Sequence, residues 1–303
     1  MSALPGQPFT RHESGGGGPT WYLAAEPGGP RPLLVLIQGS GCEPLFVDSS
    51  GNMKATAGQD LVFGLASGRF AVLVVEKPGA SVPATGETGT AGGCSEEFRR
   101  RHSLWEWAAC ISGAIDAARQ RPEVDGRAPV RIMGLSEGAI TAARLARERP
   151  DVSHIAFISG FGCDQWRDML VIARRSAPNP AEALAAVART EVGLRDIAYN
   201  PADPNRFFEG QTYVFWSTFG RACPAADLAA ASADVLVAYG TADEQIDPDG
   251  VEAIPAARIA VGKPVTMRRI VGGDHVLNTP GSAPFANLLG VFAESLDWME
   301  VAR

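Results

Sequence analysis

Ser136 is the residue whose surroundings first suggest chemistry. It lies in the pentapeptide GLSEG at 134–138, which has the spacing G-x-S-x-G. An apolar run precedes the pentapeptide, and small residues at helical spacing follow it. Glycines two positions on either side permit a sharp turn from a strand into a helix. We therefore expect Ser136 to be exposed at a strand end as a nucleophile, although a glycine-rich connection in any α/β protein would give the same pentapeptide.

A nucleophilic serine needs a base within hydrogen-bond reach and a carboxylate that orients the base. The chain has four histidines. His12 falls in a predicted N-terminal hairpin, His102 at a helix start and His154 at a strand start, whereas His275 follows the last predicted strand. The carboxyl ends of parallel strands open on one edge of a sheet. His275 is therefore predicted to be the base for Ser136.

The carboxylate should leave another strand at the same edge, and Asp243 does so just after the predicted strand 234–240. Asp247, Asp249 and Glu244 are nearby rivals. Asp274 is adjacent to His275 in sequence, which makes a hydrogen bond to that ring awkward. We expect Asp243 to be the acid, with a solvated loop aspartate as the alternative reading.

Acyl transfer also needs N–H donors for the tetrahedral oxyanion. The backbone N–H of Glu137, next to the serine, is one candidate. The loop QGSG at 38–41 follows an early strand and offers unhindered backbone. We predict that Ser40, with Gly41 next, supplies the second donor; an ordinary glycine turn is the alternative.

The elements that position these residues follow from hydrophobic patterning. Continuous apolar runs are typical of strands buried on both faces, as in parallel sheets. Such runs predict strands at 33–37, 70–75, 130–135, 154–159, 234–240 and 265–271. Helices are predicted at 59–66, 104–118 and 285–299, and a strand hairpin at 7–13 and 20–25 around the glycines at 15–18. The alternation predicts an α/β fold with a doubly wound, mostly parallel sheet.

About seventy residues separate the predicted strands at 154–159 and 234–240, far more than the usual connection of about 2–6 residues. This stretch contains a helical piece at 181–190 and an aromatic segment at 207–216. We predict a core of residues 1–162 and 234–303 with an inserted helical cap at 163–233. Trp166, Phe215 and Trp216 are expected to bind substrate as the lining of an acyl pocket, or else to form the small core of the cap.

The order serine, acid, histidine, together with GLSEG, the acid turn GTAD at 240–243 and the loop GDH at 273–275, resembles the α/β-hydrolase superfamily over about residues 30–300. The acid and histidine turns are most similar to its esterase and prolyl-oligopeptidase-like branches. The resemblance implies a catalytic triad of Ser136, Asp243 and His275 and an oxyanion hole at Ser40 and Glu137. Gln38 replaces the His-Gly of many members, Glu137 replaces an aromatic residue of the peptidases, and no propeller domain is present.

Composition narrows the class of protein. The chain has 303 residues, of which 46% are hydrophobic and 20% charged, and its formal net charge is −7. This balance provides no basic surface for nucleic acid or an anionic membrane. The longest apolar runs are far short of a bilayer span, and the N-terminus has no secretory signal pattern. We expect a cytoplasmic protein with a small-molecule partner and no metal or other cofactor, and leave a homodimer open.

The five cysteines form no C-x-x-C pattern, which argues against zinc and thioredoxin-like sites. Reduced thiols are the expectation for a cytoplasmic enzyme, with a bridge between Cys42 and Cys94 as the alternative. Glu76 and Lys77 follow a predicted strand and are interpreted as a loop ion pair rather than as catalytic groups.

The leading hypothesis is a serine hydrolase that cleaves a small to medium carboxylic ester through an acyl-enzyme. A thioesterase or an aminopeptidase could use the same residues. Scattered carboxylates in the predicted cap, among them Glu182, Glu191 and Glu209, favour the ester reading over a free-amine exopeptidase. The hypothesis of another class is a non-catalytic ligand receptor on a hydrolase fold.

Overall fold

A nine-stranded sheet forms the centre of the molecule in the computed structural model, which describes residues 1–14, 18–87 and 89–300. The strand order is β1-β2-β3-β7-β4-β8-β9-β12-β13. These strands are β1 (Ser2–Ala3), β2 (Thr10–Glu13), β3 (Thr20–Ala24), β4 (Leu33–Ile37), β7 (Ala71–Val75), β8 (Val130–Leu135), β9 (Val152–Ile158), β12 (Asp234–Gly240) and β13 (Thr266–Ile270). The pairings among β1, β2, β3 and β7 are antiparallel, and those from β7 to β13 are parallel.

Apart from the edge strand β13, the strands of the parallel part are largely buried on both faces, as their apolar sequences predict. Leu33, Val35 and Ile37 of β4 join one hydrophobic cluster, and Leu34 and Leu36 join the other. This alternation follows from the two-residue period of a strand. The prediction of a doubly wound, mostly parallel α/β sheet is confirmed.

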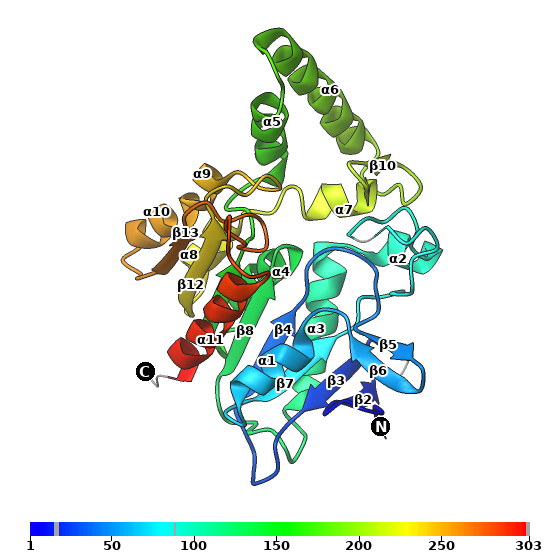
Figure 1. Cartoon of the computed structure of the whole chain (residues 1–303), viewed down its shortest axis with the longest axis vertical. Helices are drawn as coiled ribbons and strands as arrows, with labels where there is room; N and C mark the ends of the chain where they lie inside the picture. The colour runs from blue at the N-terminus through cyan, green and yellow to red at the C-terminus, as the bar shows by residue number, and fades with distance from the viewer. Residues whose placement is uncertain (15–17, 88, 301–303) are drawn as a thin grey trace.

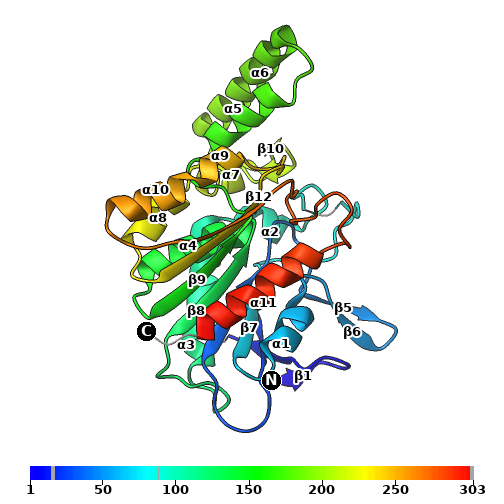
Figure 2. The ribbon, with the colours of Figure 1, turned by 60° about the vertical axis from the view of Figure 1, so that its left-hand side comes forward.

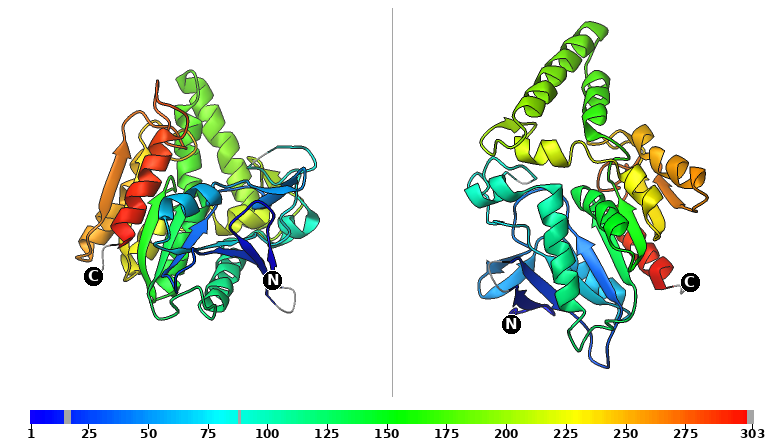
Figure 3. Two further views of the ribbon diagram at one scale, coloured as in Figure 1. Left: turned by 60° about the horizontal axis from the view of Figure 1, so that its bottom comes forward. Right: turned by 180° about the vertical axis from the view of Figure 1, so that it is seen from behind.

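Helices cover both faces of the sheet. The helices of the described residues are α1 (Gln59–Ala66), α2 (Glu96–Arg101), α3 (Leu104–Ala118), α4 (Glu137–Glu148), α5 (Gln165–Arg175), α6 (Pro180–Tyr199), α7 (Tyr213–Thr218), α8 (Pro224–Ala230), α9 (Pro248–Val251), α10 (Ala253–Ala260) and α11 (Ala286–Glu300). Helices α1 and α11 pack together on one face (Figure 2), and α3 and α4 cover the opposite face, seen from behind in Figure 3. The parallel strands lie between these two layers of helices. The candidate catalytic residues are predicted to lie just beyond the carboxyl ends of these strands.

The segment between β9 and β12 leaves the body of the molecule as a helical arm. Helices α5 and α6 pack against each other and project beyond the sheet (Figure 1), and α7 lies at their base. Two short strands, β10 (Phe207–Phe208) and β11 (Gln211–Thr212), form a hairpin before α7. The last helix of the predicted insertion, α8, packs against α4 and α10, so this part of the segment lies in the helical layer of the core.

Some local elements were not predicted. Strands β5 (Phe46–Ser49) and β6 (Asn52–Ala55) form a separate hairpin, and the short helix α2 precedes α3. Ser95 caps α2 by accepting the N–H of Phe98. Most of the predicted glycine turn at 15–18 lies outside the described residues. Within the described ranges, every helix is too short or too polar to cross a bilayer.

The expectation of reduced thiols is wrong for four of the five cysteines. Cys42 is bonded to Cys94, and Cys163 is bonded to Cys223. Cys110 remains a free thiol. The partners lie 52 and 60 residues apart in sequence, so only the fold brings them within bonding distance.

Candidate active site

Ser136 lies in the sharp turn between β8 and α4 that its glycine frame predicts. Its φ of 55° and ψ of −119° are strained for a residue with a side chain. A Cβ on Gly134 would lie 2.3 Å from the carbonyl oxygen of Gly138, and one on Gly138 would lie 2.2 Å from that of Ile37. No other residue fits these two positions. The turn therefore presents the serine hydroxyl above the N-terminus of α4.

His275 and Asp243 meet Ser136 at the carboxyl edge of the sheet. His275 Nε2 lies 2.9 Å from Ser136 Oγ, and His275 Nδ1 lies 2.7 Å from Asp243 Oδ2. Asp243 is buried, and its Oδ1 accepts the backbone N–H groups of Gln245 and Ile246. The carboxylate is thus fixed in place, and it can hold the imidazole with Nε2 directed at the serine.

The rival acids have other partners. Asp247 pairs with Arg167 of α5 at 2.7 Å. Asp274 is exposed and accepts the N–H groups of Val276 and Asn278, which shapes the loop that carries His275. Glu244 is exposed and lines the cavity described below. Asp243 is the acid that hydrogen-bonds the imidazole of His275.

The other histidines have structural surroundings. His12 stacks on Trp21 with 4.0 Å between ring centroids, and His154 packs edge-on against Trp298. His102 is different, because it is fully buried and lies directly beneath the serine turn, with Nε2 2.8 Å from Glu137 Oε1. Sequence reasoning treated it as a histidine at a helix start and missed this contact.

The loop after β4 passes beside the serine. A Cβ on Gly39 would lie 3.5 Å from Ser136 Cβ, and Ser40 lines the same cavity as Ser136 and His275. The backbone N–H groups of Ser40 and Gly41 meet no backbone acceptor among the described residues. These amides are therefore available to a bound group, as an oxyanion site requires.

Lys77 differs most from its interpretation in the sequence, which was a loop ion pair with Glu76. It does not pair with Glu76. Its ammonium lies 2.9 Å from Glu137 Oε1 and donates to the carbonyl oxygens of Gly39 at 2.7 Å and Gly41 at 3.1 Å. The side chains of Lys77 and Glu137 are 2% and 3% exposed. A buried ion pair thus connects the loop after β4 to the serine turn.

Burial and charge set the ionisation of this network. Burial opposes the charge of Glu137, but the neighbouring His102 and Lys77 outweigh burial and hold its pKa at about 2. Burial lowers the pKa of Lys77, an effect that Glu137 opposes, and burial likewise lowers the pKa of His102. His102 Nδ1 has no hydrogen-bond partner among the described residues. We assign a neutral His102 that donates from Nε2 to the Glu137 carboxylate.

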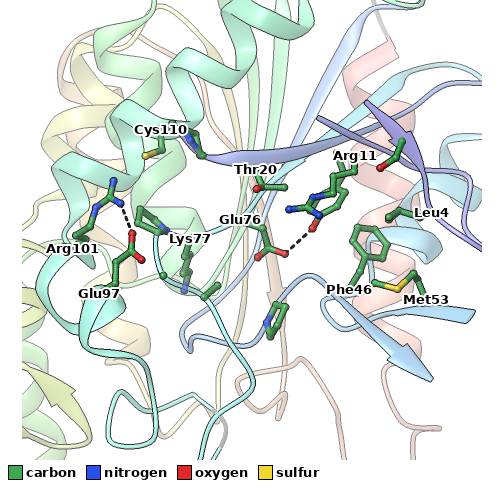
Figure 4. A pocket seen from close by; sticks show the side chains of 18 of the residues that line it. Leu4, Arg11, Thr20, Phe46, Met53, Glu76, Lys77, Glu97, Arg101 and Cys110 are labelled. Atoms are coloured by element: carbon green, nitrogen blue, oxygen red, sulfur yellow. Dashed lines mark hydrogen bonds and ion pairs between the residues drawn. The ribbon is translucent and has the colours of Figure 1, made fainter. Parts of the chain in front are cut away.

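Glu76 points to a different region. Its Oε1 accepts the N–H of Leu45 and the hydroxyl of Tyr22. It lines a cavity of about 630 Å³ beside the N-terminal strands, together with Leu4, Phe46 and other residues (Figure 4). Burial raises the pKa of Glu76 to about 7. This cavity does not include Ser136 or His275.

The cavity that contains Ser136 and His275 has a volume of about 490 Å³ and extends between the core and the cap. Its apolar lining comes from α4, α5, α7 and the loop after β9, namely Ile140, Phe161, Met169, Ile172, Phe215, Trp216 and Phe219. Phe215 and Trp216 are among these lining residues, and their binding of substrate stays a prediction. Trp166 is not among the residues that line the cavity. Its indole N–H donates to the carbonyl oxygen of Trp216 and its ring packs against Gly220, which agrees with the alternative reading as part of the core of the cap.

The charged lining of this cavity is acidic. Glu209 from the cap and Glu244 from the acid loop are exposed residues of its wall, and none of the described residues that line it is Lys or Arg. A neutral or cationic ligand is therefore favoured over an anionic one. Among the described residues, no group of His, Cys, Asp and Glu side chains is arranged to hold a metal ion.

Comparisons with known proteins were made on sequence and on structure. No family model matches the chain, and neither does any curated protein sequence. Several solved structures are similar to it. Est1E from Butyrivibrio proteoclasticus has 14% identity and a TM-score of 0.58, with 98% of this chain and 100% of Est1E covered.

Two peptidases are similar over only part of their length. Pyrococcus horikoshii acylaminoacyl peptidase has 13% identity and a TM-score of 0.60, with 98% of this chain and 42% of the peptidase covered. A Mycobacterium tuberculosis puromycin-hydrolyzing peptidase has 15% identity and a TM-score of 0.57, with 96% of this chain and 38% of the peptidase covered. Likeness at this level of identity concerns the fold.

Proposed function

We propose that this chain, which has the α/β-hydrolase fold, is a serine hydrolase that cleaves a neutral carboxylic ester of small to medium size. The fold by itself does not decide the chemistry. The observation that carries the proposal is the hydrogen-bonded chain from Ser136 Oγ through His275 to the buried Asp243, at 2.9 and 2.7 Å. These contacts have the geometry that an activated serine nucleophile needs.

In the proposed reaction, Ser136 Oγ attacks the ester carbonyl carbon while His275 Nε2 takes the hydroxyl proton. The carbonyl π electrons move to oxygen, and the resulting oxyanion accepts N–H bonds from Ser40 and Glu137, with Gly41 adjacent. Collapse expels the alkoxide, which receives the proton from His275. Water then attacks the acyl-enzyme with the same base and releases the acid. Asp243 stabilises the imidazolium at both stages.

The cavity supports an ester over an acyl-CoA. Its apolar wall suits a hydrocarbon or aromatic acyl group, and Phe215, Trp216 and Phe219 supply aromatic surface. A thioesterase that acts on acyl-CoA would need cations for the nucleotide phosphates, and the described cavity lining has none. One structural neighbour, Est1E, has been solved with ferulic acid bound, so aryl esters belong in a substrate panel.

Glu209 and Glu244 favour a second candidate, an aminoacyl esterase or aminopeptidase. Both carboxylates line the cavity, and a substrate with a free ammonium would find a counter-charge there. The candidates differ in a measurable way. A neutral ester should be hydrolysed as well as an aminoacyl ester if the carboxylates are only rim charges, and much more slowly if they recognise an amine.

The decisive experiment is labelling with a fluorophosphonate probe. We expect stoichiometric labelling of the wild type, none of Ser136→Ala, and full labelling of Ser176→Ala, which removes another hydroxyl from the cavity lining. A panel of p-nitrophenyl esters, aryl esters, acyl-CoAs and aminoacyl anilides then ranks the substrates. Failure of the wild type to react under conditions where a control esterase is labelled would favour a ligand receptor on this fold.

The cytoplasmic location and any homodimer stay predictions. The two disulfides weigh against a cytoplasmic location, because such bonds persist mainly in oxidising compartments.

A further inference from the structure

We propose that Lys77 is a positioning residue that sets the oxyanion site, by holding the loop after β4 in the orientation that directs the Ser40 N–H at the reacting oxygen. The inference rests on the proposed hydrolase function. Its basis is the fully buried ammonium, which donates to Gly39 O at 2.7 Å and Gly41 O at 3.1 Å.

Peptide geometry connects these bonds to the donor. The carbonyl of Gly39 and the N–H of Ser40 belong to one planar trans group, so they point in opposite directions. When Lys77 holds the Gly39 oxygen, the Ser40 N–H must point away from Lys77. Ser40 lines the cavity of Ser136 and His275, and its amide has no backbone acceptor among the described residues. A flip of this peptide would turn an acceptor toward the oxyanion.

A second anchor prevents that flip. Gly41 has a φ of 109°, a conformation that turns the chain so that its carbonyl also faces Lys77. The next residue, Cys42, is bonded to Cys94, and its carbonyl oxygen accepts the N–H of Ser81 at 2.8 Å. The loop is thus held at the Gly39–Ser40 peptide, which supplies the donor, and again at the two residues after Ser40.

Glu137 links the two halves of the oxyanion site. Its backbone N–H is the donor next to the nucleophile, and its side chain is the counter-ion of Lys77 at 2.9 Å. His102 Nε2 lies 2.8 Å from the same carboxylate oxygen. Lys77 also faces the ring of Trp107, with Nζ 4.5 Å from its centroid. The ion pair therefore fixes the loop after β4 relative to the serine turn, so both donors keep their separation.

The test compares the kinetics of charge-balanced variants. Lys77→Met alone leaves the buried Glu137 carboxylate unpaired, which destabilises a fold strongly. The Lys77→Met/Glu137→Gln pair removes both charges and keeps the N–H of residue 137. Lys263→Met is the matched control, because Lys263 also donates to backbone carbonyls, those of Ala229 and Ala231, but far from Ser136 in the α8 region.

Two readouts separate positioning from a merely structural role. In the charge-balanced pair we expect kcat to fall by about 10²-fold, the effect of losing one oxyanion donor, while KM changes by less than about threefold. In the adduct of an ester-like trifluoromethyl ketone, Ser136 Oγ is bonded to the former carbonyl carbon. The serine proton has moved to His275, and the π electrons of the carbonyl lie on its oxygen. Its inhibition constant should rise in parallel with the loss of kcat. Lys263→Met should change neither quantity.

Rescue provides a further measurement. Lys77→Arg keeps the charge and the donors, so it should recover part of the lost kcat. If the Met variants do not fold, Lys77→Arg by itself tests the positioning role. The planar guanidinium differs in geometry from the ammonium, so this variant should lower kcat and ketone affinity together at unchanged KM.

Folded variants at Lys77 with kcat and ketone affinity within about threefold of wild type would overturn the positioning role. An inactive wild type that does not react with fluorophosphonate would instead overturn the proposed function itself.

Discussion

At the scale of single residues, the choice of acid is the sharpest question. Asp243 and Asp247 lie in the same loop after β12, and both side chains are buried. Only Asp243 contacts His275, whereas Asp247 pairs with Arg167 across to the cap. The two carboxylates therefore have different roles, one toward the imidazole and one toward α5.

Asp243→Asn should lower kcat by about 10⁴-fold, because an amide cannot stabilise the imidazolium and can reverse the tautomer of the ring. Hydrolysis of a p-nitrophenyl ester with a matched thermal melt measures the effect. Asp247→Asn is the control and should retain most of the activity. The reverse pattern would assign the acid to Asp247.

At the scale of elements, α5 attaches the cap to the acid loop. Asp168 of α5 accepts the N–H of Asp247 and contacts Arg167, and Arg175 donates to the carbonyl oxygen of Asp243. The loop that carries the acid is thus held by cap residues. We expect disturbance of α5 to affect catalysis through this loop as well as through the cavity wall.

The ionisation of Asp168 gives a test of this attachment. Burial raises its pKa to about 7; the hydrogen bond from the Asp247 backbone N–H and the charge of Arg167 oppose the shift, and the charge of Asp247 adds to it. A carboxyl whose folded pKa exceeds the unfolded value stabilises the fold at low pH, and this contribution is lost as pH rises from the ordinary value of 3.8 to about 7.

Asp168→Asn should therefore flatten the decline of Tm between about pH 4 and about pH 7 relative to wild type, and leave the profile above about pH 8 unchanged. The exposed Asp60→Asn serves as the control, and Tm is followed by circular dichroism. An unchanged pH profile in Asp168→Asn would contradict the buried, protonated state.

At the scale of the whole molecule, two disulfides close long segments of chain. Cys42–Cys94 joins the loop after β4 to the loop after β7, and Cys163–Cys223 joins the two passages between the core and the cap. Cys163 lies just before the start of α5 and Cys223 directly precedes α8, so the second bond limits how far these two helices can separate. Both bonds act on parts that border the active-site cavity.

Loops of 52 and 60 residues correspond to about 4 kcal/mol of stabilisation for each bond in the chain-entropy description. The paired variant Cys163→Ser/Cys223→Ser should lower the free energy of unfolding by this order in urea titrations. Cys110→Ser, which removes the free thiol, is the control. A stability equal to wild type after removal of the bond would argue against its presence.

Much of the fold follows from local patterns. The strands β4 and β12 and the helix α1 begin and end at the predicted residues, because apolar runs and turn residues act over a few positions. The serine turn also depends on local sequence, since the five residues from Gly134 to Gly138 include both glycines that its backbone sterically requires. The order of the chain then sufficed to nominate His275 and Asp243, given that parallel strands open on one edge.

Tertiary structure alone decided the partners that no local pattern specifies. Lys77 lies 60 positions before Glu137 in sequence. It pairs with Glu137 and donates hydrogen bonds to the loop after β4 because β7 and β8 flank β4 in the sheet. The same holds for the cysteine pairs and for Trp166, which turns into the base of the cap. Backbone sterics are short-ranged and readable from sequence, whereas burial and ion pairing depend on which distant segments the fold brings together.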